Sequence, residues 1–151
     1  MYNKYPLCKY LPKDIIDIMS NQIKDTKIDE KERGFLICTN AKIPKNINDK
    51  NTMVKEDCIG GICGIEISGK CPGDKPIKGF FHTHPSGITL PTRDDIEYSM
   101  AHNFKFLCIG GDNEIRCMPS KIPLEIIPTS ELETEKLEEF KKKIIDCIIE
   151  I

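Results

Sequence analysis

The segment with the clearest potential for chemistry is GFFHTHPSGITLPTRDDIE, residues 79–97. His82 and His84 stand two residues apart in an extended segment, and alternate side chains of a strand point to the same face, so both imidazoles can converge on one ion. Two prolines and a glycine then predict an irregular loop before a helix that begins near Thr92, with Asp95 in its first turn. Two histidines, a carboxylate and an open fourth position are the ligand set of a catalytic zinc site, where zinc lowers the pKa of its bound water to about 7.

Each half of this segment also has a simpler interpretation. An isolated H-x-H pair is often a coincidence of the core or the surface. The run Thr-Arg-Asp-Asp at 92–95 is by itself a helix N-terminal cap, with acids placed to complement the helix dipole. An unrelated cap rarely follows an H-x-H-P turn at the matching distance, so the joined pattern favours a metal site.

The joined pattern resembles the JAMM motif of the MPN+ domain zinc metalloproteases. That motif is an upstream Glu, then H-x-H, seven residues, Ser, two residues and Asp. In this chain it reads His82-Thr-His84, seven residues, Thr92, two residues and Asp95. The resemblance covers roughly residues 28–120, and it implies a central sheet flanked by helices.

The upstream glutamate of the motif corresponds to Glu32, which leads the apolar run RGFLICT as the family's Glu leads its strand. Glu30 is the competing candidate, because it too precedes that run. A third interpretation makes Glu32 a solvated charge in the patch DEKER. The distance to the apolar run favours Glu32.

The resemblance implies a role for each matching residue. Zinc is expected on His82, His84 and Asp95, with water in the fourth position, and Glu32 is expected to act as the general base. Thr92 replaces the family's Ser and keeps the hydroxyl that would steady the oxyanion, but its β-branching restricts χ1 and leaves open whether it points to the substrate or caps the helix. Ser86, which follows HTHP, is a weaker substitute and is better explained as a turn residue.

The reaction implied by the resemblance is hydrolysis of an isopeptide or peptide bond at the C-terminal tail of a ubiquitin-like modifier. The segment 40–60, where family members carry a substrate-binding insertion, is short here. This compactness resembles prokaryotic, notably archaeal, desampylase-like members that act on sulfur-carrier-type modifiers. Two alternatives stay open: a RadC-like JAMM protein linked to DNA metabolism, and a non-catalytic MPN-type interaction scaffold.

The elements that must position these residues are those of one α/β (α+β) domain spanning residues 1–151. Hydrophobic spacing and capping signals predict three helices, at 12–25, 92–103 and about 130–150. Short apolar runs predict a mixed central sheet with strands at 32–40, 60–68, 76–83, 104–111 and 114–120. We expect 60–68 and 76–83 to be joined by the turn GKCPGDK, and the last two strands to form a hairpin.

The charge balance and the lack of long apolar runs limit the classes of partner and the cellular compartment that the sequence predicts. The chain has 22 basic and 24 acidic residues, so no basic field exists to hold phosphates, and nucleic acid is an unlikely partner. No apolar run approaches the roughly 18 residues of a membrane span, and the N-terminus lacks the apolar stretch of a secretory signal. A cytoplasmic protein is therefore expected.

Eight cysteines are too few for a disulfide scaffold in a chain of this length. In a reducing cytosol, cysteines in strands and on the apolar side of a helix are expected to be buried free thiols. This expectation applies to Cys38, Cys108, Cys117 and Cys147. For the glycine-rich cluster Cys58, Cys63 and Cys71 free thiols are favoured, while a Cys63–Cys71 disulfide and a structural zinc remain open.

Overall fold

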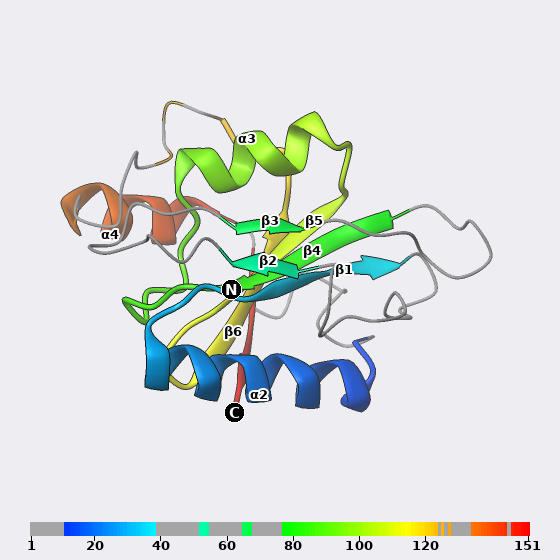
Figure 1. Cartoon of the computed structure of the whole chain (residues 1–151). Helices are drawn as coiled ribbons and strands as arrows, with labels where there is room; N and C mark the ends of the chain where they lie inside the picture. The colour runs from blue at the N-terminus through cyan, green and yellow to red at the C-terminus, as the bar shows by residue number, and fades with distance from the viewer. Residues whose placement is uncertain are drawn as a thin grey trace.

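A computed structural model describes residues 11–38, 52–54, 65–67, 77–123, 125, 127, 134–144 and 146–151. Within these residues the fold is α+β, with a five-stranded sheet, a separate two-stranded sheet and three helices (Figure 1). The predicted fold class is confirmed. None of the described helices is long and apolar enough to cross a membrane.

The five-stranded sheet has the order β1-β4-β5-β6-β7 and is mixed. β4 and β5 are parallel and are connected through helix α3, whereas the other neighbours are antiparallel. The strands are β1 (Gly34–Cys38), β4 (Ile77–Thr83), β5 (Phe106–Gly110), β6 (Glu114–Pro119) and β7 (Cys147–Glu150), and α3 spans Arg93–Ala101.

Helices cover both faces of this sheet. Helix α2 (Lys13–Asp29) lies on one face, and α3 lies on the opposite face together with α4 (Thr134–Lys143) (Figure 1). Successive residues of a strand alternate between the two cores: Phe80 packs on the α3 side and Phe81 on the α2 side. A central strand with bulky residues on both faces needs cover on both, which explains the three layers.

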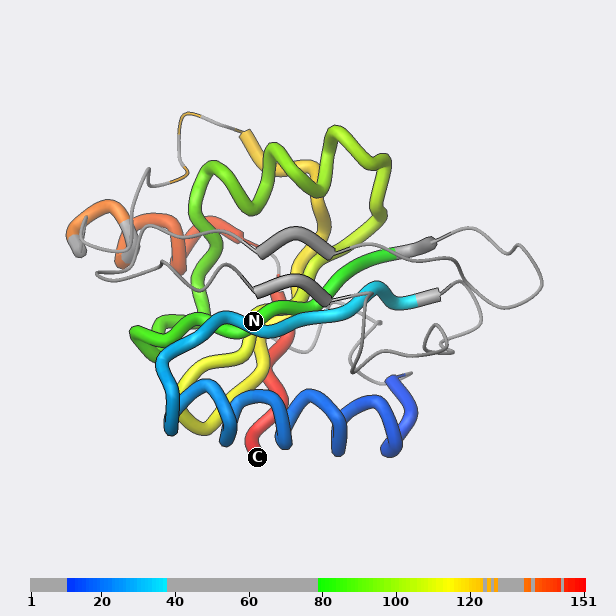
Figure 2. The backbone as a smooth tube through the Cα atoms, viewed as in Figure 1, coloured from blue at the N-terminus to red at the C-terminus, as the bar shows by residue number. Residues whose placement is uncertain are grey.

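The prediction of one C-terminal helix over 130–150 is wrong for the last residues of that range. α4 ends at Lys143, and Cys147–Glu150 form β7, which runs beside β6 at the edge of the sheet (Figure 2). Two features favour a strand there: the segment is rich in β-branched isoleucine, and the buried Asp146 forms an ion pair with Arg116 of β6.

The predicted hairpin between 60–68 and 76–83 is also wrong. β3 (Ile65–Ile67) pairs antiparallel with β2 (Thr52–Val54) in the two-stranded sheet, while β4 pairs with β1 and β5. β4 carries apolar side chains on both faces, so it lies inside the main sheet. The other predicted strands and helices correspond to β1, β5, β6, α2 and α3, including the β5–β6 hairpin, but α2 continues to Asp29, four residues beyond the predicted end at 25.

The expectation of free thiols is wrong for three cysteines. Cys108 and Cys117 lie directly opposite each other in the β5–β6 register, with Cα atoms 4.0 Å apart, and form a disulfide on the α2 side of the sheet. Cys147 is disulfide-bonded as well. Strand register brought the first pair together, and register is not visible in residue spacing. Cys58, Cys63 and Cys71 lie outside the described residues.

The Cys108–Cys117 disulfide should contribute measurably to stability. It closes a loop with a sequence separation of 9, for which loop-closure entropy gives about 2–3 kcal/mol. We therefore expect the Cys108→Ala/Cys117→Ala double variant to lose that much free energy of unfolding in guanidinium denaturation without reductant. An unchanged unfolding midpoint would show that the bridge adds no stability.

Candidate metal centre

The two motif histidines emerge on the α3 side of the sheet at the end of β4. His82 shares the parity of Phe80, and the two rings are stacked, with centroids 5.3 Å apart and planes 9° from parallel. His84 follows the last residue of the strand, and its backbone N–H donates to the Gly110 carbonyl at 2.9 Å, which continues the pairing with β5. Both imidazoles are buried, with 1% and 4% of the residue exposed.

Asp95 approaches both histidines from the first turn of α3. Its Oδ1 lies 3.1 Å from His82 Nε2 and its Oδ2 lies 3.2 Å from His84 Nε2, and the two Nε2 atoms are 2.9 Å apart. Ligand atoms around a tetrahedral zinc ion are separated by about 3.3 Å, given metal–ligand bonds of about 2.0–2.1 Å. The separation of the two nitrogens, and that of each nitrogen from its nearest carboxylate oxygen, are close to this value, so the three side chains can bind one metal ion together.

The tautomer of His84 suits a metal ligand. Its Nδ1 lies 2.8 Å from the Ile88 carbonyl oxygen, which can only accept, so Nδ1 carries a proton and donates it. Nε2, which faces Asp95 and His82, is then the nitrogen that would lose its proton to bind a metal, as is usual for metal-bound histidines oriented by an outer partner. For His82, Nδ1 is buried and forms no hydrogen bond with any described residue.

The charge on Asp95 is set by two opposed effects. Burial by itself would raise the pKa of its carboxyl group, but the adjacent His82 and His84 imidazoles outweigh this and hold the pKa well below its usual range. With 17% of the side chain exposed, the carboxylate stays ionised and faces the histidines. An anionic oxygen in that position is a suitable ligand for a divalent cation.

Thr92 is the N-cap of α3 and forms a capping box with Asp95. In this arrangement the Thr92 backbone N–H donates to Asp95 Oδ2 at 2.9 Å, and the Thr92 side chain accepts from the Asp95 backbone. Of the two orientations left open by the sequence, the hydroxyl takes the capping one. Ser86 accepts a hydrogen bond from the Ile88 backbone N–H at 3.2 Å, as expected of a turn residue.

Glu32 lies at the same site, although it comes from a different part of the chain. One ligand atom from each of Glu32, His82 and His84 falls within 4.8 Å of the others, and Glu32 is partly buried. Gly34 pairs with His82 in the β1–β4 register, which brings the start of β1 beside the end of β4. Glu30, by contrast, is exposed and ends α2 in the left-handed region, with φ 60°.

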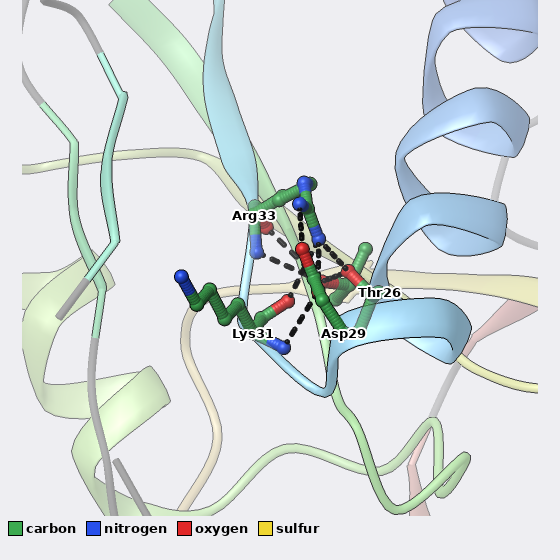
Figure 3. A network of polar contacts seen from close by, with 5 residues as sticks. Thr26, Asp29, Lys31 and Arg33 are labelled. Carbon is green, nitrogen blue, oxygen red and sulfur yellow. Dashed lines mark hydrogen bonds and ion pairs between the residues drawn. The ribbon is translucent and has the colours of Figure 1, made fainter. Parts of the chain in front are cut away.

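A polar network of the residues that flank Glu32 in the sequence joins the end of α2 to the start of β1 (Figure 3). The Arg33 guanidinium binds the Asp29 carboxylate with Nη1 2.7 Å from Oδ1, and the Lys31 backbone N–H donates to the same oxygen at 3.0 Å. The Arg33 backbone N–H donates to Thr83 Oγ1 at 2.9 Å, and this hydroxyl is also hydrogen-bonded to Thr26 at 2.7 Å. Glu32 is thereby tied to the end of α2 and to β4.

The sequence interpretation missed this network. Asp29 and Arg33 are four residues apart, but α2 ends at Asp29, so their ion pair joins the end of the helix to the segment before β1, and helical spacing did not predict it. The charged run DEKER had suggested a solvated patch instead. Thr83 had no signal, because its partners come from α2 and from the start of β1.

The described arrangement can hold a metal ion. Glu32, His82 and His84 form one ligand cluster, and Asp95 contacts both histidines. The donor set of imidazole nitrogens and carboxylate oxygens suits zinc and other first-row metals.

Zinc binding provides the direct test of this centre. The wild-type protein should bind one zinc ion per chain, and His84→Ala should weaken binding at least ~100-fold in competition with a chelating dye, because one of three ligands is lost. His102→Ala is the matched control, since His102 is exposed at the C-cap of α3. Equal losses in the two variants would contradict the assignment.

The Asp29–Arg33 ion pair makes stability depend on pH. The hydrogen bond from Arg33 lowers the pKa of Asp29 to about 2, whereas the unfolded value is about 3.9. The stabilisation is therefore present above about pH 4 and is lost as the pH falls toward about 2. Asp29→Asn should cost at most about 1 kcal/mol at pH 7, because the pair is partly exposed and screened.

This difference in stability should shrink with acidification when both proteins are denatured at a series of pH values. Asp17→Asn, an exposed position on α2, is the control and should show no such trend. A cost of Asp29→Asn that stays constant down to about pH 3 would exclude the lowered pKa as its cause.

Comparisons of the sequence with protein families and with curated proteins identified no relative. No family model matches the chain, and no curated protein matches it at a significant level.

Proposed function

We propose that this protein is a JAMM-type zinc metallopeptidase that hydrolyses an isopeptide or peptide bond at the C-terminal tail of a ubiquitin-like, sulfur-carrier-type modifier. One observation carries the proposal: the Glu32 carboxylate stands beside the His82, His84 and Asp95 cluster. A metal site used only for structure is normally closed by four protein ligands. We assign Glu32 as the base and not as a fourth ligand, so that His82, His84 and Asp95 would leave one position on the metal open for water, as in catalytic zinc sites.

The donor atoms of the four side chains suggest which of them bind the metal and which transfers protons. His82, His84 and Asp95 would hold zinc, which when bound supplies Lewis-acid chemistry and a water with its pKa lowered to about 7. Glu32 would take the proton of the attacking water and later deliver it to the leaving amine. General-base work needs a heavy-atom distance of about 2.6–3.2 Å to that water. The Glu32 carboxylate supports this role, because one of its oxygens lies within 4.8 Å of a ligand atom of each histidine.

Thr92 sets the expected level of activity. Its hydroxyl is engaged in the capping box with Asp95, so its use as an oxyanion donor would require a change of rotamer. Losing one oxyanion donor typically lowers turnover by about 10²–10³. We therefore expect slow but measurable hydrolysis, in which Thr92 contributes less than a serine would.

The substrate class is proposed from the position of the sheet edge. Among the described strands, β1 is at one end of the five-stranded sheet, and Glu32 lies two residues before it. An extended Gly-Gly tail can add beside such an edge through backbone hydrogen bonds, which favours a flexible C-terminus over a folded protein surface. The near-neutral charge of the chain favours this substrate over nucleic acid.

We also propose a cytoplasmic location, where ubiquitin-like modifiers are conjugated. The Cys108–Cys117 disulfide fits that compartment best in a hyperthermophile, since the intracellular proteins of such organisms are rich in disulfides.

The test of function is cleavage of a ubiquitin-like conjugate by the zinc-loaded protein. Glu32→Gln keeps the shape of the side chain but removes the base, so it should lower the cleavage rate by about 10²–10⁴. Zinc binding should remain if Glu32 acts as the base, as proposed, whereas a loss of zinc would show that Glu32 is itself a ligand of the cluster. The matched control is Glu30→Gln, two residues away and exposed, which should cleave like the wild type.

Three results would overturn the proposal. Equal cleavage by Glu32→Gln and wild type would remove the general base. A folded wild-type protein without zinc would favour the interaction scaffold. Zinc-dependent cutting of DNA, with no cleavage of the conjugate, would favour the RadC-like alternative.

A further inference from the structure

A buried arginine connects the metal centre to the far edge of the sheet. Arg116 of β6 is 3% exposed, and its Nη1 forms an ion pair with Oδ2 of Asp146, which is equally buried. Arg116 shares the parity of Met118, so its side chain lies on the α3 side of the sheet, the same side as the histidines. A buried ion pair rarely stabilises a fold more than apolar side chains of similar volume do.

The same guanidinium holds the loop between β4 and α3. Arg116 Nε donates to Thr89 Oγ1 at 3.2 Å, and this hydroxyl donates onward to Glu114 Oε2 at 3.0 Å. A second ion pair joins Arg116 Nη2 to Glu114 Oε2 at 3.6 Å. The planar guanidinium thus has an acid at two of its nitrogens and Thr89 at the third, so its orientation is fixed.

Thr89 directly follows the residue that orients a proposed metal ligand. The Ile88 carbonyl accepts a hydrogen bond from His84 Nδ1 at 2.8 Å, and Ile88 directly precedes Thr89, which Arg116 anchors. The other end of this loop is tied as well, because the Asp112 backbone N–H donates to the Gly87 carbonyl at 3.3 Å. The carbonyl that fixes the His84 ring therefore sits in a loop anchored on both sides.

We infer that Arg116, together with Asp146 and Thr89, is a positioning network that sets the orientation of His84 and thereby the affinity of the metal centre. This inference rests on the metal site of the proposed function. Partners that orient a metal-bound histidine through its second nitrogen typically change metal affinity by 10–100-fold when removed. Here the orienting group is a backbone carbonyl, so Thr89 and Arg116 act by holding the backbone in place.

Thr89→Val tests the link, because valine keeps the β-branched shape and removes only the hydroxyl. We expect its zinc affinity to fall ~10–100-fold relative to wild type. The visible spectrum of the Co²⁺-loaded protein should also change, since it reports ligand geometry. Thr89→Ser restores the hydroxyl and should restore both the affinity and the spectrum.

The matched control is Ser120→Ala. Ser120 is also buried and hydroxyl-bearing, but its partner is the buried Ser99. Its loss should lower thermal stability with no change in zinc affinity. If Ser120→Ala weakens zinc binding as much as Thr89→Val does, the effect is general destabilisation and the inference fails.

A second variant removes the buried Arg116–Asp146 ion pair as a unit, and the carboxylate that also loses its partner, Glu114, is 37% exposed to water. Arg116→Met/Asp146→Leu should fold, since apolar replacement of a buried ion pair is often tolerated, and it should reproduce the ~10–100-fold loss of zinc affinity. Wild-type affinity in both Thr89→Val and this double variant would overturn the inference and leave the proposed function intact. A wild-type protein that binds no zinc would overturn both.

Discussion

The pairing of β4 with its two neighbours is the constraint on which the rest of the site depends. Side chains alternate along a strand, so the register that buries Phe80 on the α3 side also puts His82 there, and it places Phe81 against α2. A slip of one residue would move the histidines to the opposite core. The antiparallel partner β1 then brings Glu32 to the end of β4, and the α3 connection to the parallel partner β5 brings Asp95 over the same face.

The sequence was sufficient for what local pattern determines. The H-x-H spacing, the Thr92–Asp95 cap and the apolar run after Glu32 each depend on a few neighbouring residues, and the structure assembles all of them at one place. The failures were non-local. The isoleucine-rich end of the chain is compatible with a helix or a strand by its local pattern. Its pairing with β6 and the ion pair of Asp146 with Arg116 favour the strand. The Cys108–Cys117 bridge likewise depends on register across two strands.

Two polar networks stabilise the site from opposite directions. At the end of α2, Asp29 and Thr83 hold the backbone around Glu32 through Arg33, at a partly exposed position. On the other side, buried Arg116 holds the loop whose carbonyl orients His84. Groups that must be placed to within a fraction of an ångström need such support from the hydrogen bonds around them.

The capping box explains how Asp95 can be held before any ion arrives. Its Oδ2 accepts the Thr92 backbone N–H while both carboxylate oxygens face imidazoles, so the rotamer needed for coordination is the one the helix start already requires. The β-branched Thr92 favours that arrangement by limiting χ1. The same restriction keeps its hydroxyl on the helix backbone and away from a substrate carbonyl. In the proposed enzyme, Thr92 would therefore serve first to hold Asp95, because its hydroxyl must leave the helix cap before it can bind a substrate oxygen.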